Sequence, residues 1–87
     1  MNKIIKFEAS WCQPCKQQAK ELDGIKIPVE SLDIEDYPDE VTKYGIRGVP
    51  TLVFLKDGEE LRRLVGLTSN RLLLKTIDEI YGANTAA

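Results

Sequence analysis

Histidine is absent from this chain of 87 residues, and cysteine occurs only twice. A cysteine–histidine catalytic pair is therefore excluded, and two cysteines cannot supply the roughly four ligands of a zinc site within one chain. The longest apolar run, residues 51–55, is far too short to span a bilayer. A formal net charge of −2 gives no basic excess, which binding to nucleic acid or to an anionic membrane would require. We therefore expect no metal, no nucleic acid and no membrane among the partners of this protein.

The composition is that of an ordinary soluble globular protein, with 43% hydrophobic and 30% charged residues. The length fits one domain near the lower limit for folding on a hydrophobic core alone. Residues 1–8 interrupt their apolar positions with charge and show no cleavage-site pattern, so they do not read as a signal peptide. We therefore expect a cytoplasmic protein, in a reducing compartment where a structural disulfide would be unusual.

The hydrophobic pattern predicts four strands, at residues 3–9, 28–34, 51–56 and 60–65. The Asp57-Gly58 pair between the last two strands predicts a tight antiparallel hairpin. The first two strands are joined through a helix and should be parallel, by a right-handed crossover. The expected fold is α/β: a single domain at residues 1–82 with a mixed four-stranded sheet and helices on both faces. Residues 83–87 are expected to be a flexible tail.

Three helices complete the predicted order β-α-β-α-β-β-α. The first contains Pro14 in its first turn and ends at Gly24, and its predicted inward stripe is Cys15, Ala19 and Leu22.

The second and third helices also carry start and stop signals. The second starts at a cap, Asp36, followed by Pro38, and ends at Gly45. The third starts from caps at residues 68–70 and ends at Gly82. Its apolar repeat consists of Leu73, Ile77 and Ile80.

The two cysteines lie two residues apart, directly after an apolar strand, and this spacing suits a pair that cycles between dithiol and disulfide. Cys12 falls in the first turn of the first helix, where the free N–H groups and the positive end of the dipole favour a thiolate. Cys15 falls on the buried side. A purely structural disulfide is a weaker alternative, since closing so short a loop removes little entropy from the unfolded chain.

These motifs resemble those of the thioredoxin family. Residues 11–15 (Trp-Cys-Gln-Pro-Cys), 44–51 (Tyr-Gly-Ile-Arg-Gly-Val-Pro-Thr), 56–59 and 65–66 occur in the family's order and near its spacing. The resemblance covers about residues 3–82, without the amino-terminal strand and helix of full-length thioredoxins. It implies a thioredoxin-like fold and a monomeric protein-disulfide reductase that needs no cofactor besides its redox-active disulfide. Its expected partners are thioredoxin reductase or a similar electron donor, and disulfide-containing proteins.

The resemblance also implies roles for individual residues. Cys12 would be the attacking nucleophile and Cys15 the resolving cysteine. Pro50 would follow a cis peptide bond beside them, with the backbone of Val49 pairing with an extended substrate segment. A simple strand-starting proline and a core tryptophan at position 11 remain alternatives. The implied substrate-binding rim consists of Trp11, Ile46, Val49, Gly66 and Leu67.

Two positions depart from the family pattern. Lys6 stands where many thioredoxins have a buried aspartate that assists proton removal from the resolving cysteine, and Glu8 replaces a family tryptophan. The two side chains project from the same face of a strand. Glu8 could have taken over proton transfer, Lys6 could lose its proton on burial and act as the base, or the pair could be structural. The remaining interpretation leaves both residues solvated at the sheet margin.

Two other functions compete with a thioredoxin. A glutaredoxin-type, glutathione-dependent reductase fits the short length, but its usual inner dipeptide differs from Gln13-Pro14, which favours a reductase of the thioredoxin kind. The other is a binding subunit that stabilises a partner enzyme through the apolar rim, with its redox state incidental.

Overall fold

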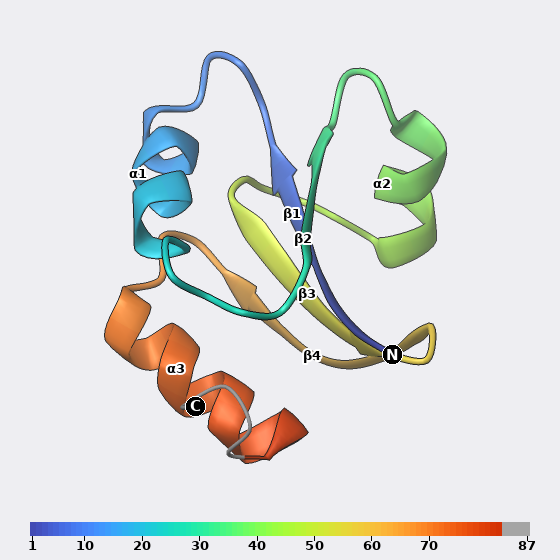
Figure 1. Ribbon diagram of the computed structural model, residues 1–87. Coiled ribbons are helices and arrows are strands. Elements are labelled where there is room, and N and C mark those ends of the chain that lie inside the picture. Colours follow the sequence, from blue (N-terminus) through green and yellow to red (C-terminus); the bar gives the residue numbers. More distant parts are fainter. Residues whose placement is uncertain (83–87) are drawn as a thin grey trace.

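A computed structural model describes residues 1–82 (Figure 1). The flexible tail expected at residues 83–87 lies outside the described residues. Within them the elements follow the predicted order, and their bounds are β1 (Asn2–Glu8), α1 (Gln13–Glu21), β2 (Val29–Asp33), α2 (Pro38–Tyr44), β3 (Thr51–Lys56), β4 (Glu59–Val65) and α3 (Asn70–Tyr81).

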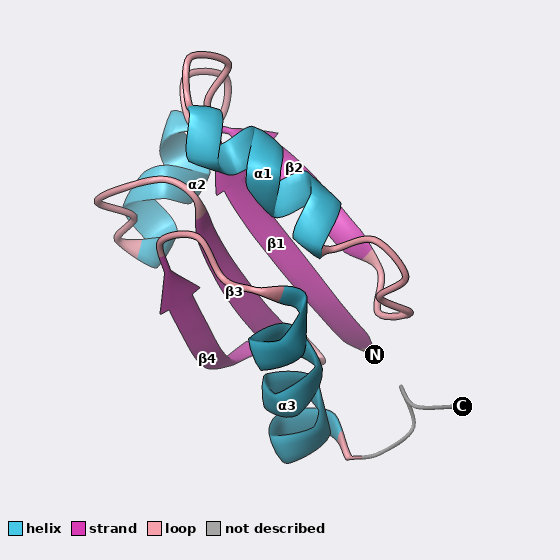
Figure 2. Cartoon of the chain, turned by 90° about the vertical axis from the view of Figure 1, so that its left-hand side faces the viewer, coloured by secondary structure: helices cyan, strands magenta, loops and turns pink. Residues whose placement is uncertain are grey.

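The strands form one mixed sheet in the order β2-β1-β3-β4. β1 is parallel to β2 and antiparallel to β3, and β3 pairs with β4 as an antiparallel hairpin. The hairpin turn is made by Asp57 and Gly58, which both have positive φ (52° and 84°), as a type I′ turn requires. Figures 1 and 2 show α1 and α3 on one face of the sheet and α2 on the other. The predicted α/β fold is confirmed.

The core of the described residues has two main apolar clusters, one on each face of the sheet, and a third, smaller cluster of Ala9, Cys12 and Cys15. Successive strand side chains point to opposite faces, so β1 supplies Ile4 to one cluster and Ile5 to the other. The buried residues of the first are Ile4, Ile27, Leu52, Phe54, Leu73 and Ile77, beneath α1 and α3. Those of the second are Ile5, Phe7, Leu32, Val53 and Leu55, beneath α2. Leu22, the C-cap of α1, packs against the first cluster and attaches the end of that helix to the sheet.

The inward face of α1 differs from the predicted one. Cys15 is buried as expected, but Ala19 is exposed and Gln18 is fully buried instead. Residues three and four positions apart both neighbour a given residue on a helix surface, so periodicity alone does not choose between them. The Gln18 amide is accommodated inside because it hydrogen-bonds the backbone of Thr68.

The predicted cap of α2 was wrong. Its N-cap is Tyr37, which makes no side-chain capping hydrogen bond, and Asp36 instead belongs to the preceding turn, where its N–H donates to the carbonyl of Asp33. The end of α2 is as predicted, with Gly45 in the left-handed conformation (φ 63°).

Two further helix ends position the segments around the site. α1 ends at Glu21, three residues before the predicted stop at Gly24. Ser69 caps α3, because its hydroxyl oxygen accepts a hydrogen bond from the N–H of Leu72 at 3.2 Å.

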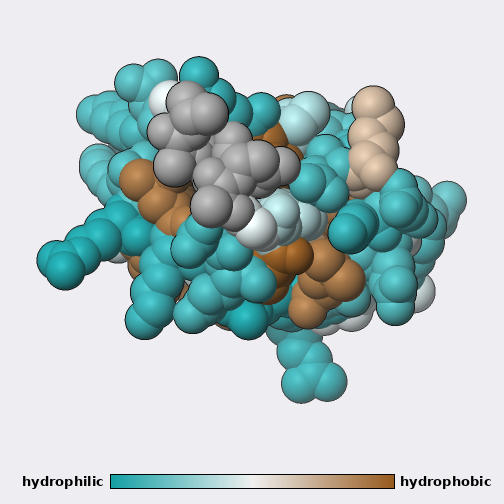
Figure 3. Space-filling model, turned by 60° about the horizontal axis from the view of Figure 1, so that its bottom comes forward, coloured by the Kyte–Doolittle hydropathy of each residue, from teal (hydrophilic) through white to brown (hydrophobic). Residues whose placement is uncertain are grey.

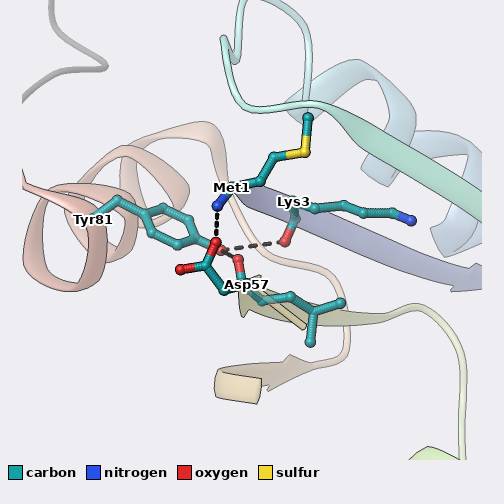
Figure 4. A network of polar contacts seen from close by, with 5 residues as sticks. Met1, Lys3, Asp57 and Tyr81 are labelled. Carbon is teal, nitrogen blue, oxygen red and sulfur yellow. Dashed lines mark hydrogen bonds and ion pairs between the residues drawn. The ribbon is translucent and has the colours of Figure 1, made fainter. Parts of the chain in front are cut away.

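Tyr81, the last residue of α3, ties that helix to the sheet (Figure 4). Its hydroxyl donates a shared hydrogen bond to the carbonyl oxygens of Leu55 (2.6 Å) and Lys3 (3.2 Å). Beside it, the α-amino group of Met1 pairs with the carboxylate of Asp57. Burial raises the pKa of Tyr81 above its usual value of 10.0.

Figure 3 brings the bottom of Figure 1 forward and shows a mostly hydrophilic face, on which the visible apolar side chains gather in a few small areas. Within residues 1–82, no helix is both long enough and apolar enough to cross a membrane.

Candidate redox site

Cys12 and Cys15 form a disulfide at the start of α1, with their Cα atoms 5.3 Å apart. Cys12 is the N-cap, and its Sγ accepts a hydrogen bond from the N–H of Cys15 at 3.1 Å. Pro14 lies in the first turn, where its missing N–H costs nothing. The N–H of Cys15 and the positive end of the helix dipole thus both act on the Cys12 sulfur. Both favour the thiolate form of Cys12 once the disulfide is reduced.

The two cysteines are almost equally buried. Cys12 is 4% and Cys15 2% exposed, and both pack against Ala9, with Ile34 and Val49 beside them. The sequence placed Cys15 on the buried side of the helix and Cys12 at its start, and in the disulfide form the exposures of the two residues differ only slightly. The distinguishing feature of Cys12 is therefore its place at the helix N-terminus.

The turn before β3 lies beside the disulfide. The Val49–Pro50 peptide bond is cis, the geometry that the resemblance implies, and Pro50 is buried. The carbonyl of Pro50 accepts a hydrogen bond from the N–H of Gly66 at 2.8 Å, and the hydroxyl of Thr51 donates to the carbonyl of Gly48 at 2.7 Å. Pro50 is therefore connected to the end of β4, and Val49 is held against the cysteines.

The expected rim residues are only partly assembled around the cysteines. Val49 contacts the cysteine cluster, whereas Ile46 packs on the core cluster beneath α2. Trp11 is 65% and Leu67 50% exposed, which excludes the alternative of a core tryptophan. Gly66 joins the rim through its hydrogen bond to Pro50.

Lys6 and Glu8 form an ion pair behind the resolving cysteine. The Lys6 side chain is 6% exposed and that of Glu8 31%, and Lys6 Nζ lies 2.8 Å from Glu8 Oε1. The interpretation that leaves both residues solvated is therefore wrong for Lys6. Both line a hollow of about 270 Å³, together with Ala9, Ser10, Cys15, Lys16 and Ala19. The pair thus lies next to Cys15, on the side of the sheet that α1 covers.

Sequence reasoning missed Gln18, which holds the site together and whose signal was its position one helical turn after Cys15. It also missed Arg63 in β4, which connects that strand to the end of α2: it donates to the carbonyl of Tyr44 at 2.6 Å and to the carboxylate of Glu60 at 2.7 Å and 2.9 Å. Arg63 lowers the pKa of the Glu60 carboxyl through these hydrogen bonds. Within residues 1–82 there is no group of three or more histidine, cysteine, aspartate or glutamate residues that could hold a metal ion.

Comparisons with known proteins agree with this site. The thioredoxin family model matches residues 1–79. A thioredoxin from Chlamydia caviae is 36% identical over 81 residues, which cover 87% of this chain and 79% of that protein. One from Rhodospirillum rubrum is 34% identical over 80 residues, covering 85% and 77%.

Solved structures give the same result. A mutant thioredoxin from Halobacterium salinarum superposes with a TM-score of 0.84 at 30% identity, covering 90% of this chain and 73% of that one. Mitochondrial thioredoxin 3 from Saccharomyces cerevisiae, in its oxidised form, gives a TM-score of 0.81 at 26% identity, covering 91% and 78%.

A redox disulfide at a helix N-terminus, on this fold, defines a thiol–disulfide oxidoreductase. The chain belongs to the thioredoxin family. Its redox centre is the Cys12–Cys15 pair. Neither the glutaredoxin alternative nor the binding-subunit alternative is favoured by these matches.

Proposed function

We propose that the protein reduces disulfides in target proteins, with Cys12 as nucleophile and Cys15 as resolving cysteine. The observation that carries the proposal is the Cys12 sulfur at the N-cap of α1, where it accepts the N–H of Cys15. The Cys12 thiolate attacks one sulfur of the target disulfide and bonds to it, and the other target sulfur leaves as a thiolate and takes up a proton. Cys15 then attacks Cys12, forming the internal disulfide and releasing the second target thiol. Two electrons have passed from the protein to its target.

Substrate docking is proposed at the edge of the site formed by Val49. Among residues 1–82, neither the N–H nor the carbonyl of Val49 has a backbone hydrogen-bond partner. An extended target segment can therefore pair with this backbone as an added strand. The apolar side chains of Trp11 and Leu67, both exposed, provide further contact area, and Gly66 and Ile46 complete the rim.

Proton transfer is proposed to use the Lys6–Glu8 pair. Cys15 must lose its proton before it attacks, and it lines the same hollow as both charged side chains. Glu8 is partly open to solvent, so its carboxylate can accept a proton, directly or through a water, and pass it on. Lys6 holds that carboxylate in place and supplies a positive charge near the sulfur. The alternative in which Lys6 itself is the base predicts that Lys6→Met loses the pH dependence of the resolving step while Glu8→Gln keeps it.

The identity of the electron donor distinguishes a thioredoxin, which a reductase enzyme recharges, from a glutaredoxin, which glutathione recharges. We propose a thioredoxin reductase or a similar enzyme, with no cofactor bound by this chain. The test is insulin reduction driven either by NADPH and thioredoxin reductase or by NADPH, glutathione and glutathione reductase. Turnover with the first system only is expected, and the Cys15→Ser variant, which lacks the resolving thiol, should give none with either. Turnover with glutathione alone would contradict the proposal.

We also propose that the protein works as a cytoplasmic monomer. Both cysteines belong to the redox pair, so the fold uses no other disulfide, which suits a reducing compartment. Sedimentation should give a single species near 9.8 kDa. A stable dimer, or enrichment in a secreted fraction of the source cells, would contradict this.

A further inference from the structure

A buried glutamine joins the helix of the cysteines to the segment between β4 and α3. Gln18 is 0% exposed and lies one turn after Cys15. Its Nε2 donates to the carbonyl of Thr68 at 2.9 Å, and its Oε1 accepts from the N–H of Thr68 at 2.8 Å. The side-chain amide offers both a donor and an acceptor, so the two bonds to one residue fix its orientation as well as its distance.

The hydrogen bonds continue from Thr68 to the turn at Pro50. The Thr68 hydroxyl donates to the carbonyl of Gly66 at 3.2 Å, and the N–H of Gly66 donates to the carbonyl of Pro50 at 2.8 Å. Gly66 has φ 88°, a conformation natural only to glycine. Gln18 thus links three parts of the site: the helix of the cysteines, the segment with Gly66 and Leu67, and the turn at Pro50.

A second contact from α1 holds the same segment further from the cysteines. The N–H of Asn70 donates to Glu21 Oε1 at 2.6 Å, and Asn70 Nδ2 donates to the carbonyl of Glu21 at 2.8 Å. The stretch at residues 68–70 is therefore attached to α1 at two points three residues apart along the helix. Gln18 is the point nearer to the cysteines, and the one that is fully buried.

We propose that Gln18 is a positioning residue for substrate docking, which sets the place of residues 66–68 relative to Cys12 and thereby the affinity for protein substrates. The inference rests on the proposed contact of Gly66 and Leu67 with target proteins. Without the amide, the N–H and carbonyl of Thr68 would be buried without partners, and the segment would move to satisfy them in water. Cys12 would keep its helix N-terminus, so its attack on a small disulfide that needs no docking would be unchanged.

The test compares Gln18→Met with Lys20→Met, a control at an exposed position of the same helix whose side chain forms no hydrogen bond with the segment at residues 66–70. Methionine keeps the length of the side chain and removes both hydrogen bonds. KM for insulin should rise about fivefold in Gln18→Met, because we expect only part of the loss of the two hydrogen bonds, about the net free energy of one, to weaken docking. The value of kcat and the rate with a small aromatic disulfide should change by less than about twofold, because a purely local effect on docking leaves the chemistry intact. The control variant should match the parent in KM for insulin, in kcat and in the rate with the small disulfide.

Two results would overturn the inference: an unchanged KM in the folded Gln18→Met variant, or an equal slowing with the small disulfide. If Gln18→Met does not fold, Gln18→Leu takes its place, since it also lacks both hydrogen-bonding groups and should still raise KM. The unaltered protein provides a further check, because the Thr68 N–H should exchange with deuterium much more slowly than the N–H of exposed Leu67. Equal exchange would remove the basis of the inference.

The Leu67→Ser variant separates this inference from the proposed docking role. If it leaves KM unchanged, the docking role of the rim fails. If it raises KM while Gln18→Met does not, the docking role stands and only the inference fails. When both raise KM, the double variant should show less than the sum of the two effects, because the residues act through one segment.

Discussion

Removing Glu8 should destabilise the protein, whereas removing its partner Lys6 should not. Lys6 is almost fully buried, while Glu8 is about one-third open, with side-chain exposures of 6% and 31%. Glu8→Gln leaves a buried ammonium without its carboxylate. Losing one partner of a fully buried pair costs about 3–5 kcal/mol. Because water can enter on the Glu8 side, we expect the smaller cost of about 2 kcal/mol. For a chain of this size that lowers Tm by about 8–16 °C.

Lys6→Met should have the reverse effect. Methionine fills a similar volume without a charge to bury, so the change should be neutral or stabilising by about 1 kcal/mol. In the Lys6→Met background, Glu8→Gln should lower the free energy of unfolding by almost nothing further, because the buried Lys6 ammonium that it would leave unpaired is no longer present.

Urea unfolding of the oxidised protein measures these free energies. A matched control is Glu30→Gln, since Glu30 pairs with Lys3 across β1 and β2 but both side chains are close to half exposed (44% and 47%). That variant should change stability by less than about 1 kcal/mol. If Lys6→Met destabilises the protein more than Glu8→Gln does, the account of a buried charge held by its partner is refuted.

Two further predictions concern the resolving cysteine and the C-terminal helix. Cys15→Ser should hold target proteins as mixed disulfides through Cys12, and a variant that still reduced insulin at the parent rate would exclude the two-cysteine mechanism. Because burial raises the pKa of Tyr81 in the folded protein, the unfolded chain loses this proton first, so stability should fall as pH rises above about 10. The parent and Tyr81→Phe should therefore differ less in urea midpoint at pH 10.5 than at pH 8. A constant difference would show that ionisation of Tyr81 is not coupled to folding.

Local patterns predicted most of the fold and the reacting atoms. The apolar runs located all four strands, the Asp57-Gly58 pair located the hairpin, and the spacing of Cys12 and Cys15 indicated the redox pair. Each of these signals lies within a few adjacent residues, and the periods of strands and helices are short-range properties.

Two of the features that sequence reasoning missed depend on contacts between distant residues. Gln18 is buried because its partner, Thr68, lies 50 residues away, and nothing near it in the chain announces that partner. The strand period placed Lys6 on one face, but only the covering helix α1 makes that face a buried one. The Asp36 cap failed for a local reason: Asp36 lies one residue before the N-cap, in a turn where its N–H donates to the carbonyl of Asp33. Tertiary contacts overrode local preference for Gln18 and Lys6.

The central claim is that the place of Cys12 at the N-cap of α1 makes it the reactive thiol. The direct measurement is brief iodoacetamide treatment of the fully reduced protein near neutral pH, followed by mass spectrometry of its peptides. The account predicts one early adduct, on Cys12, with Cys15 labelled only after long exposure or in urea. Preferential labelling of Cys15, or equal labelling of both thiols in the folded protein, would contradict it.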